Sequence, residues 1–129
     1  MLKFAYTILY VKNAAQSVAF YQKAFGLTQR FIHETGQYAE METGATTLAF
    51  TSNELAQFNL PQGFQENSLL NLPAGIEVGF VADDVSATFA QALTVGATAV
   101  VQPKVKPWGQ TVAYVRDLDG VLIEIASAM

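Results

Sequence analysis

The same order of strand-like and helix-like segments occurs twice along the chain. Residues 2–11 are rich in aromatic and β-branched side chains, which indicates a strand, and residues 14–25 have apolar side chains at helical spacing. Gly26 then marks a helix end, and three short strand-like runs follow. The second half repeats this order with a strand at 76–81, a helix from residue 85, Gly96, and strand-like runs at 98–102, 110–116 and 121–126. Such a repeat predicts two similar units, each with a sheet face that it cannot bury alone.

Spacing and capping residues support the repeat. Val11 to Gly26 and Val81 to Gly96 both span 15 residues, and Leu48-Ala49-Phe50 matches Ile123-Glu124-Ile125. Asn13 in the first half, and Asp83 or Asp84 in the second, are suitable N-caps. We therefore predict an α+β fold of two βαβββ modules, residues 1–52 and 74–129, in a single domain spanning 1–129. Residues 53–73 are predicted to be a connecting loop, whose apolar residues Phe58, Leu60 and Phe64 pack onto the fold.

Composition narrows the functional classes. The chain has 129 residues, a net charge of -4, only 14% charged residues and 51% apolar residues. Nucleic-acid binding needs clustered cations, which seven Lys and Arg without a cluster do not supply. No apolar stretch approaches the roughly 20 residues of a membrane span, and the absence of cysteine excludes thiolate metal sites. We expect a cytoplasmic protein, and the thinly charged surface favours a homodimer.

Three segments carry a resemblance to a known family. They are YTILYVKNAAQSVAFYQKAFGL at 6–27, GIEVGFVADDVSATFAQALTVGA at 75–97 and PWGQTVAYVRDLDGVLIEI at 107–125. In this order and spacing they resemble the glyoxalase, bleomycin-resistance protein and extradiol dioxygenase family, the vicinal oxygen chelate superfamily. The closing turn is Asp117-Leu118-Asp119-Gly120, with Leu118 where the family usually has proline. The resemblance implies two curved sheets that enclose a cleft for a small molecule.

The resemblance also implies a set of site residues. Metal-binding members hold a divalent ion at four strand positions, which here are Tyr6, Ala49, Glu77 and Glu124. Ala49 has no donor atom and tyrosine is an uncommon ligand, so two carboxylates remain, enough for a weakly bound divalent metal at best. We therefore expect no cofactor and no tightly bound metal. The single histidine, His33, lies away from these positions and is expected to be a surface or structural residue.

The remaining candidates line the expected cleft. Glu124 and Glu77 are the candidate catalytic residues, since burial would raise the pKa of either carboxyl and suit it as a general base. Alternatively, Glu124 is a structural carboxylate hydrogen-bonded to Tyr6 or Tyr114. The candidate ligand-binding residues are Tyr6, Ile8, Tyr10, Ala49, Trp108 and Tyr114.

Three functions remain open from the sequence. The first is a protein that binds a small organic molecule without a tightly bound metal, as bleomycin-resistance proteins bind a drug. The second is an enzyme: a metal-assisted glyoxalase-like lyase or isomerase, or a dioxygenase-like oxidoreductase. The third is a degenerate module that serves as an interaction partner. Fold analogy does not choose among them, because one fold hosts several chemistries.

Overall fold

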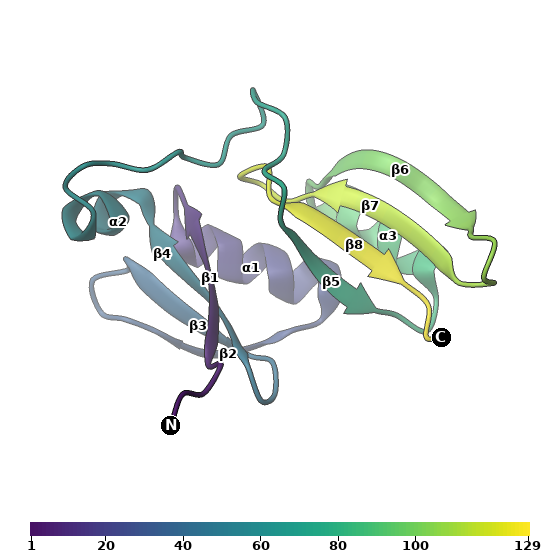
Figure 1. Cartoon of the computed structure of the whole chain (residues 1–129), viewed down its shortest axis with the longest axis horizontal. Coiled ribbons are helices and arrows are strands. Elements are labelled where there is room, and N and C mark those ends of the chain that lie inside the picture. Colours follow the sequence, from purple (N-terminus) through teal and green to yellow (C-terminus); the bar gives the residue numbers. More distant parts are fainter. The chain divides into compact units, whose positions relative to one another are not determined.

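The computed structural model describes all residues from 1 to 129, and these form two compact units. The first unit comprises Met1–Gln22 and Gly26–Glu66, and the second comprises Lys23–Phe25 and Asn67–Met129. Each unit contains a four-stranded sheet covered on one face by a helix (Figure 1). The predicted α+β fold with two repeated modules is confirmed.

The first unit has the strand order β1-β4-β3-β2. Strands β1 and β4 run parallel, and the other neighbours are antiparallel. Its elements are β1 (Tyr6–Val11), α1 (Ala14–Phe25), β2 (Thr28–Ile32), β3 (Tyr38–Glu42), β4 (Thr47–Ser52) and α2 (Asn53–Asn59). The last residues of α1, Lys23–Phe25, are grouped with the second unit.

The second unit has the corresponding order β5-β8-β7-β6, with β5 and β8 parallel. Its elements are β5 (Glu77–Val81), α3 (Val85–Val95), β6 (Thr98–Val105), β7 (Thr111–Arg116) and β8 (Leu122–Ala126). Strand β6 is longer than the predicted run 98–102. It continues through Pro103, which an edge strand tolerates because one row of its backbone groups needs no partner.

The predicted helix caps are confirmed. The Asn13 side chain accepts a hydrogen bond from the Gln16 N–H at 2.9 Å, and Asp84 does the same for the Ala87 N–H at 2.9 Å. These bonds satisfy backbone donors that a first helical turn otherwise leaves unpaired. Of the two aspartates considered, Asp84 is therefore the cap.

The core of each unit lies between its sheet and its helix. In the first unit, Tyr21 of α1 packs on Phe50 of β4 with ring centroids 5.1 Å apart, and both are fully buried. In the second unit, Phe89 and Ala92 of α3 are buried, as are Ile123 and Ile125 of β8. Because successive strand residues point to opposite faces, every second residue of each strand lies on the sheet face away from the helix, here called the open face.

The expected equivalence of Val11 and Val81 is wrong by one residue. Val11 is fully buried on the helix side, whereas Val81 lies on the open face and is 71% exposed. The capping residues Asn13 and Asp84 show the true alignment, in which Val11 corresponds to Ala82. The equal spacing to the stop glycines arises because α3 is one residue shorter than α1, at 11 against 12 residues.

The expected loop 53–73 contains a helix. Its first seven residues form α2, which begins because the Ser52 side chain accepts a hydrogen bond from the Leu55 N–H at 3.1 Å. Ala56 is its buried residue. The expectation that the apolar residues of this link pack onto the fold fails for Phe58, which is 82% exposed, and holds for Phe64. None of the helices is both long and apolar enough to span a bilayer.

Candidate functional site

The open face of the first unit carries four of the predicted site residues. Tyr6, Ile8 and Tyr10 alternate along β1, and Ala49 of β4 lies directly opposite Ile8. Tyr6 is 50% exposed and Ile8 is 42% exposed, so this edge strand presents large apolar side chains to solvent on the open face. Ala49 is fully buried between larger neighbours. These four residues therefore share the open face, and Ala49 contributes no accessible surface to it.

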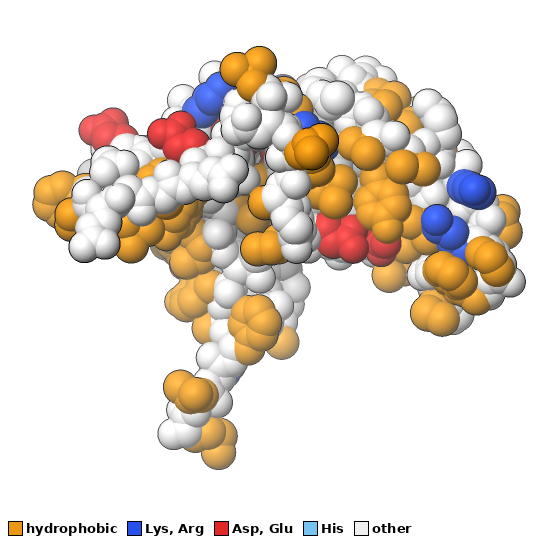
Figure 2. All heavy atoms as spheres, turned by 45° about the horizontal axis from the view of Figure 1, so that its top comes forward, with side chains coloured by type: hydrophobic (Ala, Val, Ile, Leu, Met, Phe, Trp, Pro, Cys, Tyr) orange, Lys and Arg blue, Asp and Glu red, His pale blue; other side chains and the backbone are white.

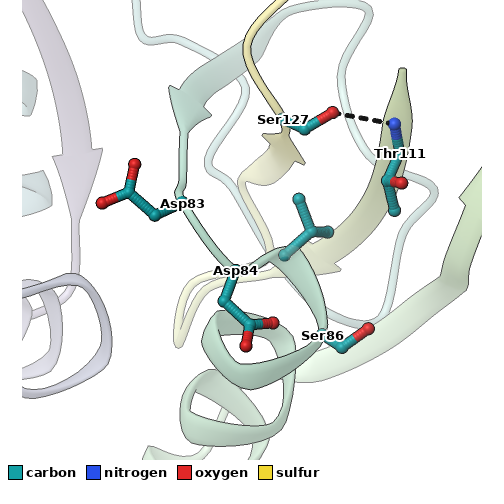
Figure 3. Close-up of a pocket in the computed structure, with 6 residues that line it drawn as sticks. Asp83, Asp84, Ser86, Thr111 and Ser127 are labelled. Atoms are coloured by element: carbon teal, nitrogen blue, oxygen red, sulfur yellow. Dashed lines mark hydrogen bonds between the residues drawn. The ribbon is translucent and has the colours of Figure 1, made fainter. Parts of the chain in front are cut away.

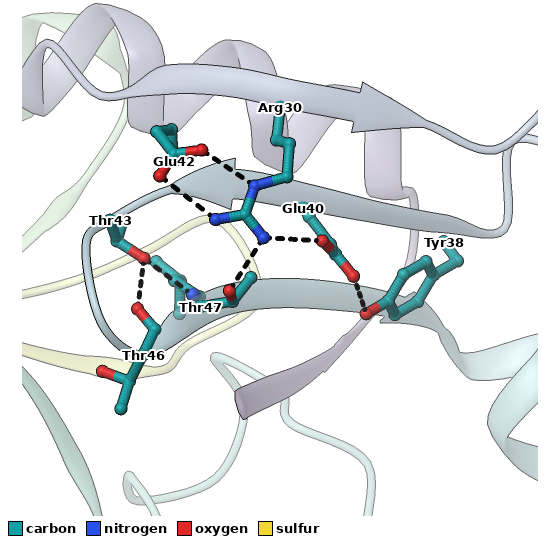
Figure 4. A network of polar contacts seen from close by, with 8 residues as sticks. Arg30, Tyr38, Glu40, Glu42, Thr43, Thr46 and Thr47 are labelled. Atoms are coloured by element: carbon teal, nitrogen blue, oxygen red, sulfur yellow. Dashed lines mark hydrogen bonds and ion pairs between the residues drawn. The ribbon is translucent and has the colours of Figure 1, made fainter. Parts of the chain in front are cut away.

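An ion-pair network on the same face was not anticipated. Arg30 of β2 donates two hydrogen bonds to Glu42 at 2.9 and 3.1 Å, and one of 3.0 Å each to Glu40 and Thr47 (Figure 4). Tyr38 donates to the other oxygen of Glu40 at 2.7 Å. Burial and this bond both raise the pKa of the Tyr38 hydroxyl, and the two carboxylates raise the pKa of Arg30. A carboxylate does lie beside Ala49, because Glu40 is its cross-strand partner, but Arg30 neutralises it.

A signal for this network was present in the sequence. Tyr38, Glu40 and Glu42 occupy alternate positions of one strand, which marks a polar strand face. Only the pairing of β2 with β3 brings Arg30 beside them, and that pairing contains a register shift between Gln29 and Phe31.

The open face of the second unit brings together three predicted residues. Tyr114 of β7 lies opposite Glu124 of β8 and donates a hydrogen bond to it at 2.8 Å. Glu124 in turn lies opposite Gly79, two residues along β5 from Glu77. Glu77 is exposed, but partial desolvation and the negative charge of Glu124 raise the pKa of its carboxyl. The bond to Glu124 is the main cause that raises the pKa of Tyr114 to about 12.

The residues of β8 alternate between the two faces of the sheet. Leu122 and Glu124 are half-buried on the open face, while Ile123 and Ile125 are fully buried against the helix layer. Of the two expected tyrosine partners of Glu124, the structure shows Tyr114.

Trp108 lies in the turn between β6 and β7 and is 62% exposed. Its indole N–H donates to the Gln110 side chain at 2.9 Å, and Gln110 donates to the Ser127 carbonyl at 2.8 Å. These two bonds fix the orientation of a ring that is otherwise in solvent.

A shallow cavity of about 270 Å³ lies at the start of α3 (Figure 3). It is lined by Asp83, Asp84, Val85, Ser86, Thr111 and Ser127. Asp84 caps the helix, and the Ser127 hydroxyl oxygen accepts a bond from the Thr111 N–H at 2.9 Å. These polar groups serve the fold, and none of the predicted site residues lines the cavity.

The four family metal positions do not fit a divalent ion. Ala49 offers no donor atom, Tyr6 offers only a phenol oxygen, and two carboxylates do not complete the ligand set of a first-row metal. No three histidine, aspartate or glutamate side chains gather in the structure. His33 lies in the exposed turn after β2, where its Nδ1 is hydrogen-bonded with the Thr35 hydroxyl at 2.8 Å.

Solved structures share the fold at low sequence identity. A glyoxalase-related enzyme from Fulvimarina pelagi has a TM-score of 0.84 at 18% identity, covering 99% of this chain and 89% of that one. A glyoxalase/bleomycin resistance protein/dioxygenase family enzyme from Burkholderia phytofirmans PsJN has a TM-score of 0.81 at 21% identity, with 99% and 100% covered. A lactoylglutathione lyase from Agrobacterium tumefaciens has a TM-score of 0.69 at 20% identity, with 96% and 92% covered.

The search of curated protein sequences found no match to the chain. The family model described as Glyoxalase-like domain, in contrast, matches residues 4–129. Its match covers nearly the whole chain, and the repeated βαβββ units agree with it. The chain therefore belongs to the glyoxalase-like domain family, within the vicinal oxygen chelate superfamily.

Proposed function

We propose that this protein binds a small organic molecule on its open faces and does so without a tightly bound metal. Large apolar side chains that remain exposed in a sheet favour contact with an apolar ligand. Tyr6 and Ile8 provide such a surface in the first unit. Hydrophobic side chains are exposed over both units in the space-filling view (Figure 2).

The observation that carries the proposal is the group formed by Glu124, Tyr114 and Glu77. Glu124 is half-buried and accepts a hydrogen bond from the neutral Tyr114 hydroxyl, whereas Glu40 and Glu42 of the first unit both pair with the cationic Arg30. A carboxylate that is partly desolvated without a cation lowers stability. A ligand that donates hydrogen bonds to Glu124 would offset this cost, and such a role explains why a charge stands there.

A metal-free enzyme is the second candidate, and the raised pKa of Glu77 favours it. A carboxyl with a raised pKa is a better general base near neutral pH than an ordinary one. In this mechanism Glu77 would accept a proton from the substrate, while Glu124 and Tyr114 hold the substrate by hydrogen bonds. The metal-assisted alternatives are not supported by the donor set at positions 6, 49, 77 and 124.

Ligand-dependent melting tests the binding function. The purified chain is heated with members of a panel of small aromatic and aliphatic compounds, and the midpoint of unfolding is measured. A ligand at 100 times its Kd stabilises the folded state by about 2.7 kcal/mol, which raises the midpoint measurably. A midpoint that no compound changes would contradict the binding function.

Elemental analysis of the same preparation tests the metal-free part of the proposal. We expect no stoichiometric Ni, Zn, Fe or Mn after purification without chelator. About one such ion per chain, lost when Glu77 and Glu124 are mutated, would contradict the metal-free proposal and support a metal-assisted enzyme instead.

A further inference from the structure

The link between the two sheets reaches back onto the open face of the first unit. Phe64 lies against Tyr10 of β1, with ring centroids 5.0 Å apart and ring planes at 77°. Tyr10 shares this face with Tyr6 and Ile8. The link therefore adds an aromatic side chain to the surface proposed above for ligand binding.

Few contacts hold this part of the link. Between Leu60 and Glu66, Phe64 is the one side chain that is not exposed. The turn before it is closed by a hydrogen bond from the Gly63 N–H to the Leu60 carbonyl at 2.8 Å. Glu66 after it accepts a longer bond of 3.3 Å from Asn53. Phe64 on Tyr10 is thus the main apolar anchor of residues 60–66.

The arrangement of the Tyr10 and Phe64 rings suits contact with a flat ring of a ligand. Two aromatic rings at nearly a right angle form a corner, and a third planar ring can contact the face of one and the edge of the other. On the same face, Arg30 already uses four N–H groups on Glu40, Glu42 and Thr47, so its charge is compensated within the fold. The corner itself presents the aromatic carbon of Tyr10 and Phe64.

We propose that Phe64 is a specificity-determining residue that, together with Tyr10, selects a flat aromatic ring in the ligand. This inference rests on the proposed binding function and deepens it by naming the ligand class. In this arrangement Tyr10 and Phe64 form the two walls of the corner, and the link holds Phe64 in place.

Titration with two matched probes tests the inference. 2-Naphthol is a flat two-ring alcohol, and 2-decalol has the same skeleton but is saturated and puckered. We expect the parent protein to bind 2-naphthol more tightly than 2-decalol, as measured by NMR titration. Phe64→Ala should weaken 2-naphthol binding about three- to tenfold, the equivalent of one aromatic pair, and leave 2-decalol binding nearly unchanged.

The chain offers a matched control in Phe58→Ala. Phe58 lies in the same link, in α2, but is 82% exposed, so its removal should leave both affinities unchanged. Phe64→Leu keeps apolar volume without the ring, and it should also lose the preference for 2-naphthol even if Phe64→Ala fails to fold.

The results distinguish the proposed binding function from the proposed role of Phe64 in selecting aromatic ligands. If aliphatic compounds raise the melting midpoint but 2-naphthol does not bind, ligand binding stands and the inference is wrong. Equal affinities of parent, Phe64→Ala and Phe64→Leu for 2-naphthol would also overturn it. If no compound binds to the parent, both proposals fail.

Discussion

At the scale of single residues, the two open faces differ in how they hold their carboxylates. Glu40 is buried and bonded to both Arg30 and Tyr38, so its charge is compensated within the fold. Glu124 has the neutral Tyr114 as its partner, and Glu77 has a raised pKa. We infer that Glu40 contributes mainly to structure, and that the carboxylates of the second unit are those available to a ligand.

Glu124→Gln is expected to leave the fold intact, with equal or slightly higher stability. The Gln side-chain oxygen can still accept the Tyr114 hydroxyl, and the repulsion with Glu77 disappears. Ligand affinity should fall about tenfold, because a hydrogen bond to a charged group is worth about 1.5–3 kcal/mol. Thermal unfolding and calorimetric titration measure the two effects.

Glu34→Gln is the control for this variant, since Glu34 is an exposed carboxylate in a turn of the first unit. It removes the same charge and should leave affinity unchanged. An unfolded Glu124→Gln variant, or one that binds every ligand as tightly as the parent, would show that Glu124 is a structural carboxylate.

The raised pKa of Glu77 should make the folded state less stable as the pH rises. Because its pKa is raised in the folded state, the folded protein holds this proton at a pH where the unfolded chain has released it. The associated stability is fully present below the ordinary glutamate pKa of about 4.3 and is lost as the pH rises through the raised pKa. Glu77→Gln should therefore be more stable than the parent at neutral pH.

The difference in melting midpoint between Glu77→Gln and the parent, measured from acid to neutral pH, checks this prediction. It should grow as the pH rises. A difference that stays constant with pH would mean that the environment of Glu77 does not favour its protonated form.

At the scale of elements, the turn between β7 and β8 is held from several directions. The Asp117 side chain accepts bonds from the Asp119 and Val121 N–H groups, both at 2.9 Å. Arg116 donates to the Gly120 carbonyl at 2.8 Å and to the Ser68 carbonyl at 3.1 Å. These bonds define the turn without the proline usual in the family, and they tie the start of the second unit to it.

Gly120→Ala is expected to destabilise the second unit strongly. Gly120 has a φ of +96°, and an added Cβ would lie 2.9 Å from the Ser68 carbonyl carbon and 3.0 Å from the Leu69 nitrogen. These are backbone atoms, so relief requires the chain to move. We expect a loss of about 2–4 kcal/mol from the left-handed conformation and the overlap together, measured by urea unfolding.

Gly109→Ala isolates the conformational part of that loss. Gly109 has nearly the same φ, +94°, but an added Cβ there would meet nothing within 4 Å. Its substitution should cost about 1–2 kcal/mol. If the two variants lose the same stability, the contact of Ser68 and Leu69 with the turn is not significant in solution.

At the scale of the whole molecule, we predict a homodimer. The outer strands β2 and β6 contain register shifts, which discourage pairing with another chain, whereas the outer strands β1 and β5 pair regularly with their neighbours. Exposed apolar residues such as Val81 and Trp108 add surface that a partner copy would cover. Sedimentation velocity at micromolar concentration should show the mass of a dimer, and a clean monomer would contradict the prediction.

The sequence by itself determined the repeated modules, the helix cap at Asn13, an aspartate cap at residue 83 or 84, and the face of each strand that carries Tyr6, Tyr10 and Glu124. These features follow from local periodicity and capping chemistry, which involve residues close together in the chain. The same local reasoning missed α2, because seven residues are too few for a clear helical period.

Only the tertiary structure decided which side chains meet. Arg30 reaches Glu40 and Glu42 through an irregular strand pairing, Tyr114 bonds to Glu124 across two neighbouring strands, and Phe64 returns from the link to Tyr10. The one-residue error between Val11 and Val81 has the same origin. Register depends on hydrogen bonds between strands distant in the chain, and a shift of one residue moves a side chain to the other face.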